Sequence, residues 1–170
     1  MARPEKSEYP EYYHSYVSKS QGDNAVKVLE DSNAITRKLF KNVEDEKGAF
    51  AYAEGKWTLN ELVQHLIDSE RVFAYRLMRI ARNDKTPMPG FEQDDYVPES
   101  NANNKKLSEL LIEANVLRNS TLLLVKGLSD EMLTRKGIAS DWEMSVRALC
   151  FTIAGHEIHH MQVIKEKYLT

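Results

Sequence analysis

The sequence predicts an all-α fold, an antiparallel four-helix bundle with a long crossover loop between helices two and three. Four segments of roughly 20 residues carry apolar side chains at steps of three and four residues, which is the periodicity of amphipathic helices. A stretch rich in proline and asparagine separates the second segment from the third. The sequence shows no fixed-period repeat and no pair of strands with hairpin turn chemistry. Four helices with one apolar stripe each bury those stripes most economically as a bundle.

The first helix is predicted over residues 23–46, where the apolar positions at helical steps are Val26, Leu29, Ile35, Leu39, Phe40 and Val43. The second helix is predicted from Thr58 to about Arg82. It opens with a capping box, in which the Thr58 hydroxyl accepts from the backbone and the Glu61 side chain reaches back. Its apolar face consists of Leu62, Leu66, Val72, Phe73, Leu77 and Ile80.

Residues 83–104 are predicted to form the crossover loop, because they contain Pro87, Pro89, Gly90 and Pro98. The third helix is predicted over residues 105–126, and Gly127 is a suitable stop. The fourth is predicted over residues 144–168, which contain no proline. Between these two helices, residues 134–141 are expected to hold a short extended or turn segment at most.

Composition bounds the class of protein. The 170 residues are expected to form a single domain, 1–170, and the 42% hydrophobic and 29% charged residues are those of an ordinary globular chain. A net charge of −3 with no block of lysine or arginine argues against nucleic-acid and membrane partners. The charged N-terminus and the lack of an apolar run of about 18 residues predict a cytoplasmic protein.

Cysteine usage restricts the kind of metal site that one chain can build. Cys150 is the only cysteine, so a disulfide within the chain and a cluster of thiolate ligands are both excluded. Because it lies about 120° around the fourth helix from His156, it is expected to be a buried, inert thiol. Any metal ion must therefore use nitrogen and oxygen ligands.

Histidines supply a candidate set of ligands. His156 and His160 lie one turn apart and about 40° apart around the fourth helix, so they can share one ion. His65 lies on an unusually polar stripe of the second helix and is predicted to be the third ligand. Three protein ligands leave a position open for water or substrate, as in catalytic sites. Histidine ligation suits zinc, nickel, copper or ferrous iron, with one divalent ion per chain.

The remaining histidines and polar residues receive lesser roles. His159 is expected at the edge of the groove, as a hydrogen-bond partner of a ligand or an alternative ligand, and His14 is expected to serve packing or the surface. Among the polar residues near the cavity, Glu61 is read as a helix cap, and Arg76 is expected to pair with Glu70 or Glu46. Asp68 is the other candidate in this group.

Two other readings of the motif His156-Glu-Ile-His-His160 are weak. It matches the H-E-x-x-H signature of zinc proteases, but the glycine and third histidine of the extended form are replaced by Val163 and Glu166. A di-iron bundle needs two Glu-x-x-His pairs together with two further carboxylates. The second such pair, Glu11 and His14, lies outside any predicted helix.

The sequence resembles the DinB/YfiT-like superfamily of metal-binding four-helix bundles. The resemblance rests on residues 55–70, GKWTLNELVQHLIDSE, with Arg76 downstream, and on SVR at 145–147 and AGHEIHH at 154–160. It implies that His65, His156 and His160 bind a nickel- or zinc-type ion, with iron as a further option, and that the protein forms homodimers. The superfamily includes transferases that use bacillithiol, isomerases that use mycothiol, and members assigned only as metal-dependent hydrolases.

Three functions remain open at this point. In a transferase, the ion would activate a low-molecular-weight thiol, whereas in a hydrolase it would activate water; either enzyme would take a small-molecule substrate. The third possibility is a stress-associated protein that binds a metal or ligand without catalysis. The substrate does not follow from the fold, because function depends on the site.

Overall fold

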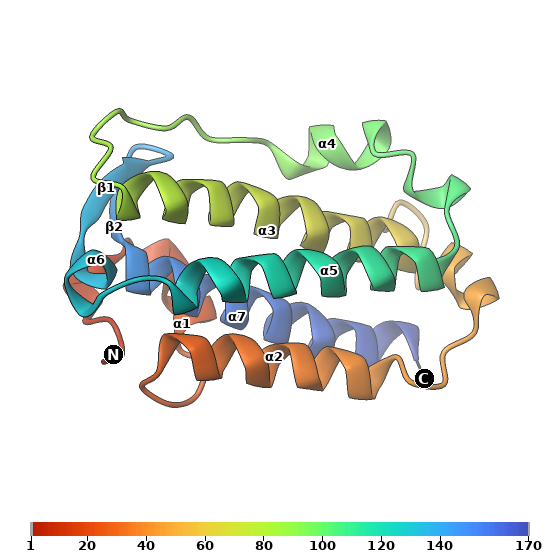
Figure 1. The fold of residues 1–170 in the computed structure, drawn as a ribbon. Coiled ribbons are helices and arrows are strands. Elements are labelled where there is room, and N and C mark those ends of the chain that lie inside the picture. The colour runs from red at the N-terminus through yellow and green to blue at the C-terminus, as the bar shows by residue number, and fades with distance from the viewer. Residues whose placement is uncertain (1, 170) are drawn as a thin grey trace.

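The computed structural model describes residues 2–169 and places four long helices side by side (Figure 1). These helices are α2 Ala25–Leu39, α3 Leu59–Ala81, α5 Leu107–Lys126 and α7 Val146–Val163. The predicted all-α class and four-helix bundle are confirmed. No helix among the described residues is long and apolar enough to cross a membrane.

Shorter elements occupy the N-terminus and the connections. They are η1 Lys6–Glu8, η2 Glu11–Tyr13, α1 His14–Val17, η3 Asp45–Ala49, α4 Gln93–Glu99, η4 Ala102–Asn104, α6 Asp130–Thr134, β1 Lys136–Ala139, β2 Trp142–Ser145 and the π-helical turn η5 Ile164–Tyr168. The first long helix thus ends at Leu39, seven residues before the predicted boundary at residue 46.

The crossover determines the directions of the helices. In Figure 1 the chain leaves the left end of α3, runs back over the outside of the bundle through α4, and enters α5 at the right. The neighbours α3 and α5 therefore run parallel, as do α2 and α7. The antiparallel relation holds between α3 and α7 and between α2 and α5, which are also in contact.

Helix α3 begins where the sequence predicts. The Glu61 N–H donates to the Thr58 hydroxyl at 3.1 Å, and the Thr58 N–H donates to the Glu61 carboxylate at 2.7 Å. These two bonds satisfy donors that the first turn leaves without helical partners. The cap fixes the start of the helix, so His65 lies on the second turn, facing α7.

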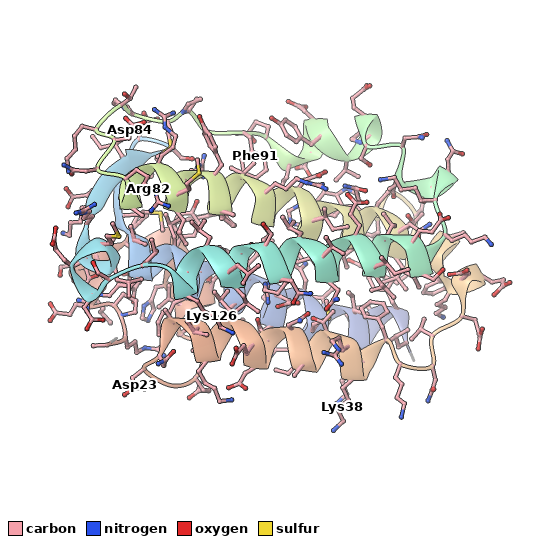
Figure 2. All side chains as sticks on the ribbon, viewed as in Figure 1. Asp23, Lys38, Arg82, Asp84, Phe91 and Lys126 are labelled. Carbon is pink, nitrogen blue, oxygen red and sulfur yellow. The ribbon has the colours of Figure 1, made fainter. Side chains whose placement is uncertain are left out.

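The predicted crossover loop contains a helix that the sequence does not reveal. Segment α4 has seven residues, of which only Val97 is buried. One buried residue produces no amphipathic stripe, and Pro98 near the C-terminal end argues against a helix. Phe91 lies on the crossover, which passes along α3 (Figure 2). The same view shows charged side chains such as Lys38 pointing away from the bundle.

Residues 134–141 were expected to hold a short extended or turn segment at most, but they include one strand of a hairpin and its turn. Strands β1 and β2 pair antiparallel, from Lys136 opposite Ser145 to Ala139 opposite Trp142. Their two-residue turn, Ser140 and Asp141, has φ values of 51° and 65°. Such turns usually contain Asn-Gly or Asp-Gly, so Ser-Asp carries little signal. Because β2 includes residues 144 and 145, α7 begins two residues later than predicted.

The core consists of two apolar clusters separated by a polar layer. One cluster occupies the end of the bundle near the hairpin, including Phe73, Leu77 and Leu149, and the other includes Leu62, Leu110 and Met161. The buried polar residues that lie between these clusters along α3, α5 and α7 are His65, Ser69, Glu70, Arg118, His156 and Glu157.

The N-terminal segment is attached to the bundle by a buried ion pair. Glu8 accepts hydrogen bonds from Arg147 Nε at 2.7 Å, Ser145 Oγ at 2.7 Å and the Glu5 N–H at 3.0 Å. Burial by itself raises the pKa of Glu8, but these hydrogen bonds outweigh burial and lower the pKa to about 2. The residues that follow Glu8 include Tyr13 and Tyr16, which reach the polar layer.

Replacing Glu8 with glutamine is expected to lower the free energy of unfolding by about 3 kcal/mol at pH 7. Because the folded-state pKa is depressed, this stabilisation is present above the ordinary glutamate pKa of about 4.5 and is lost as the pH falls toward about 2. Urea denaturation of both proteins between pH 7 and pH 2 measures the difference. A difference that stays constant across this range would contradict the assignment.

Candidate metal centre

Three imidazoles meet in the polar layer between α3 and α7. Nε2 of His156 lies 3.2 Å from Nε2 of His65 and 3.1 Å from Nε2 of His160. One ligand atom from each of the three residues lies within 4.8 Å of the other two, which is a spacing that one ion can bridge. The structure therefore brings together the three histidines nominated from the sequence, and their role as ligands stays a prediction.

Burial keeps the three rings neutral. His65 and His156 are 3% and 6% exposed, and His160 is partly buried. Burial lowers the pKa of His65 to about 4 and, together with the neighbouring histidines, lowers that of His160 to about 3. The pKa of His156 also lies well below its ordinary value, from burial and then from the other histidines. Neutral imidazoles carry the lone pairs that a metal ion needs.

The donor geometry fits a divalent ion. Two nitrogens bound tetrahedrally at 2.0–2.1 Å lie about 3.3 Å apart, close to the spacings found here. A ring nitrogen carries either a proton or a lone pair, so Nε2 of His156 cannot satisfy both of its close neighbours by hydrogen bonding. A cation between three lone pairs removes this conflict. Ser69 Oγ lies 3.4 Å from Nδ1 of His65, and an Nδ1–H donated to it leaves the Nε2 lone pair free.

Aromatic rings surround the three histidines. The rings of Trp57 and His65 are 5.0 Å apart, and those of Tyr16 and His156 are 5.2 Å apart with an edge-on geometry. Tyr16 approaches because residue 155 is glycine: a Cβ there would lie 1.9 Å from the Tyr16 carbonyl oxygen. Tyr16 and Trp57 also line the cavities next to the centre.

Two cavities reach the centre, one at His156 and the other at His160. The larger, here called the front cavity, has a volume of about 450 Å³, and its walls include His156, Ser69 and Arg76. The second, of about 290 Å³, is bounded by His160, Trp57 and Tyr168. Asp94 of α4 lines both cavities. An ion held by the three nitrogens would thus be accessible to small molecules.

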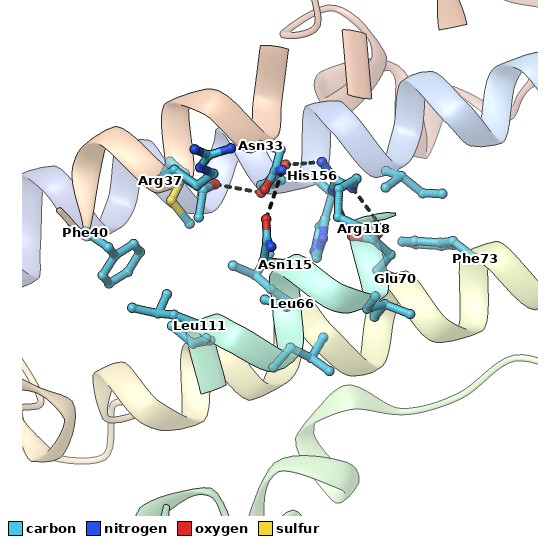
Figure 3. Close-up of a pocket in the computed structure, with 18 residues that line it drawn as sticks. Asn33, Arg37, Phe40, Leu66, Glu70, Phe73, Leu111, Asn115, Arg118 and His156 are labelled. Carbon is cyan, nitrogen blue, oxygen red and sulfur yellow. Dashed lines mark hydrogen bonds and ion pairs between the residues drawn. The ribbon is translucent and has the colours of Figure 1, made fainter. Parts of the chain in front are cut away.

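A buried ion network lies behind His156. Arg118 of α5 donates two hydrogen bonds to Glu70, at 2.9 and 2.8 Å, and one to Glu157 at 2.7 Å. Glu157 also accepts from Thr36 Oγ1 at 2.6 Å. The network bounds an interior cavity of about 60 Å³, and Figure 3 shows Arg118 beside His156 among the residues that line it.

This network settles the roles of two carboxylates. Glu157 faces Arg118 rather than the histidine cluster, so it is not placed as the general base of a zinc protease. The expected pairing of Arg76 with Glu70 or Glu46 was wrong, because Glu70 is bound to Arg118. Arg76 instead donates to Pro89 O at 2.7 Å and to Ser140 Oγ at 2.8 Å.

Other nominated residues lie farther from the centre. Asp68 accepts from Gln64 and Arg71 on the outer side of α3, and Glu61 caps α3 and accepts from Asn103. Neither lines the two cavities at the centre. Their expected place near the cavity is thus not supported.

The histidines and the cysteine outside the cluster are placed largely as expected. His159 is half-buried, with its ring 5.6 Å from that of Tyr16, and His14 stacks on Tyr9. Cys150 is buried, and burial raises its pKa to about 12, so its thiol is inert at neutral pH.

Comparison with known proteins identifies the family. The DinB superfamily model matches residues 29–164. A protein of Oceanobacillus iheyensis, provisionally named a metal-dependent hydrolase, is 27% identical over 147 residues, which is 81% of each chain.

Two solved structures share the fold. YfiT from Bacillus subtilis, described as a probable metal-dependent hydrolase with an unusual four-helix bundle topology, has a TM-score of 0.74 and 19% identity over 96% of this chain and 89% of that one. A DinB-like protein of Bacillus subtilis, YjoA, has a TM-score of 0.60 and 19% identity over 85% and 90%. These structures support the fold, and the match to the family model over most of its length shows that the chain belongs to the DinB superfamily.

Proposed function

We propose that the protein is a metal-dependent enzyme in which His65, His156 and His160 hold one divalent ion that activates a nucleophile. The observation that carries the proposal is the convergence of three neutral imidazole nitrogens at a point reached by two cavities. An ion bound there would lower the pKa of a thiol or water toward neutrality. We propose zinc or nickel, with iron as the alternative.

The nucleophile we favour is a low-molecular-weight thiol, transferred to a small electrophilic substrate. A thiolate attacks without a general base once it has lost its proton. This suits the site, since Glu157 faces Arg118 and no buried carboxylate among residues 2–169 belongs to the histidine cluster. The aromatic walls provided by Trp57 and Tyr16 would hold an apolar electrophile and exclude water.

Hydrolysis is the second candidate, because the relative from Oceanobacillus iheyensis and YfiT are both described as metal-dependent hydrolases. A hydrolase requires a group that accepts a proton from water. Asp94 is the carboxylate placed for this role, since it lines both cavities and its charge raises the pKa of His65 against the effect of burial.

Turnover by the metal-loaded protein distinguishes these reactions. Thiol transfer predicts that a small thiol and a chloro-nitro-aromatic or an epoxide react in proportion to bound metal, and that Asp94→Asn retains this rate. Hydrolysis predicts that an ester, amide or phosphoester is turned over without added thiol, and that the rate falls by about 100-fold in Asp94→Asn. Inactivity toward both sets with a filled site would overturn the enzyme proposal and favour a non-catalytic metal-binding protein.

We also propose that the protein forms a homodimer through α5. Ile112, Val116 and Leu123 project within about 40° of one another on this helix and are 65%, 63% and 74% exposed. A stripe of exposed aliphatic side chains is self-complementary about a twofold axis, which is the commonest symmetry of oligomers.

The variant Leu123→Glu is expected to convert the dimer into a monomer at micromolar concentration, because it places two carboxylates in the apolar interface. Light scattering should give about twice the chain mass of 19.6 kDa for the wild type and one chain mass for the variant. Ile35→Glu, at an exposed aliphatic residue on α2, is the control and should remain dimeric. A monomeric wild type would refute the proposal.

A further inference from the structure

Arg76 is a buried cation for which the described residues provide no acidic partner. Its side chain is 2% exposed, yet residues 2–169 contain no ion pair that includes it. Arg118, the other buried arginine, binds two carboxylates. Burial lowers the pKa of Arg76, and Tyr13 acts in the opposite direction. Charged groups this deep are normally paired, so an anionic ligand in direct contact with Arg76 would supply the partner that the described residues do not.

The guanidinium faces the front cavity, in which the histidine centre also lies. His65 and Arg76 are 11 residues apart on α3, which places them within about 20° on one face and about 16 Å apart along the axis. Long side chains on a helix lean toward its N-terminus, which is the direction of His65 from Arg76. Ser69 and Phe73 line the cavity between them.

Part of the guanidinium is free to bind a ligand. Its hydrogen bonds to Pro89 O and Ser140 Oγ both use Nη2, and the Tyr13 hydroxyl is a further uncharged partner of the guanidinium. Among residues 2–169, the fully buried side-chain polar atoms that lack a hydrogen-bond partner are Asn60 Oδ1, Thr152 Oγ1 and His160 Nδ1. No nitrogen of Arg76 is among them, and the side chain lines the front cavity, so the N–H groups that Pro89, Ser140 and Tyr13 leave free can bind a ligand there. The Phe91 ring, 5.9 Å from Cζ, bounds the other side.

We propose that Arg76 is a specificity-determining residue that binds a carboxylate of the substrate or thiol, while the reacting end of the same molecule lies at the histidine centre. This step rests on the proposed function and names a class of ligand for it. A carboxylate matches the planar fork of a guanidinium. Glu92, Asp94 and Asp141 line the same cavity and are exposed, so the rim repels ligands with several negative charges.

Carboxylate binding can be tested without a metal. Hexanoate and hexanamide have nearly the same shape but differ in charge. Binding is followed by the fluorescence of Trp142, which lines the cavity, in a Trp57→Phe background where Trp142 is the remaining tryptophan of the sequence. Hexanoate is expected to bind at least about tenfold more tightly than hexanamide. Arg76→Gln should abolish this preference, and Arg76→Lys should retain part of it. Ser140→Ala keeps the guanidinium and should keep the preference.

Equal affinity for hexanoate and hexanamide in the otherwise unchanged protein would overturn the proposal, whatever the stability of the Arg76 variants. A preference that survives in folded Arg76→Gln would overturn it as well, since the anion would then bind elsewhere.

A second measurement links the carboxylate site to the histidine centre. Cobalt-loaded protein is titrated with ω-mercapto acids of increasing length and with their amides, and the thiolate-to-cobalt absorption band reports binding. One range of chain lengths should favour the acids about tenfold, and Arg76→Gln should remove that advantage. If the band never forms but hexanoate is still preferred, thiol activation fails and the carboxylate site stands. A band of equal strength for acids and amides at every length overturns the link.

Discussion

Replacing His156 with alanine is expected to reduce bound metal from about one ion per chain to a small fraction of that. Nε2 of His156 is the atom that both other imidazoles approach, at 3.2 and 3.1 Å. Its removal leaves two nitrogens without the group between them. Loss of a mere hydrogen-bond partner of a ligand lowers metal affinity by about 10- to 100-fold, so loss of this ligand should exceed that range. Metal-dependent turnover should fall with it.

Elemental analysis after dialysis against zinc or nickel measures the stoichiometry, and competition with a chelating dye measures the affinity. His159→Ala is the matched control, because it removes an imidazole from the same helix that lies outside the cluster. Thermal denaturation of both variants establishes that they are folded. Comparable metal loss in His159→Ala, or full occupancy in His156→Ala, would show that the ligands have been misassigned.

The histidine pair could be predicted because its geometry is local. Residues four apart on a helix lie on one face whatever the tertiary structure, so His156 and His160 required only that their segment be helical. His65 required a further assumption, that the polar stripe of its helix faces the bundle interior. The structure places all three together, between two apolar clusters.

The fold was predictable where periodicity and caps agree, as in α3 between Thr58 and Arg82. It was not predictable where short elements depend on tertiary contacts. Segment α1, His14–Val17, has one buried residue, and its position depends on the close approach of the Tyr16 carbonyl to Gly155. No local pattern identifies such a contact, so Tyr16 was missed as a neighbour of His156.

The partners of the buried charges also could not be predicted from the sequence. Glu70, Arg118 and Glu157 come from three helices, and their meeting depends on the rotation of each helix about its axis. The crossover makes α3 and α5 parallel neighbours and sets Glu70 opposite Arg118. Arg76 was expected to pair with Glu70 or Glu46, but Glu70 pairs with Arg118, which also binds Glu157.

Replacing Arg118 with methionine is expected to lower the free energy of unfolding by about 3–5 kcal/mol, because it breaks two buried ion pairs. Arg118 uses all three of its nitrogens, with Glu70 on α3, Glu157 on α7 and the Leu29 carbonyl and Ser32 hydroxyl on α2. Burial by itself lowers its pKa, but the two carboxylates raise the pKa above the ordinary arginine value. Methionine fills similar space and leaves both carboxylates buried without a cation.

Urea denaturation compares this variant with two controls. Arg71→Met breaks an ion pair with the partly exposed Glu113 and should cost less than about 1 kcal/mol. The triple variant Arg118→Met, Glu70→Gln, Glu157→Gln removes every charge of the network and should recover most of the loss, because the cost of the single change arises from uncompensated charge rather than from missing volume. If the triple variant is instead less stable than the single one, uncompensated charge is not the source of the loss, which then arises from the missing hydrogen bonds of Arg118 to α2, α3 and α7. Because Glu157 follows His156 directly on α7, that result would also assign to Arg118 a part in holding the rotation of this helix, and metal affinity should then fall in the triple variant as well.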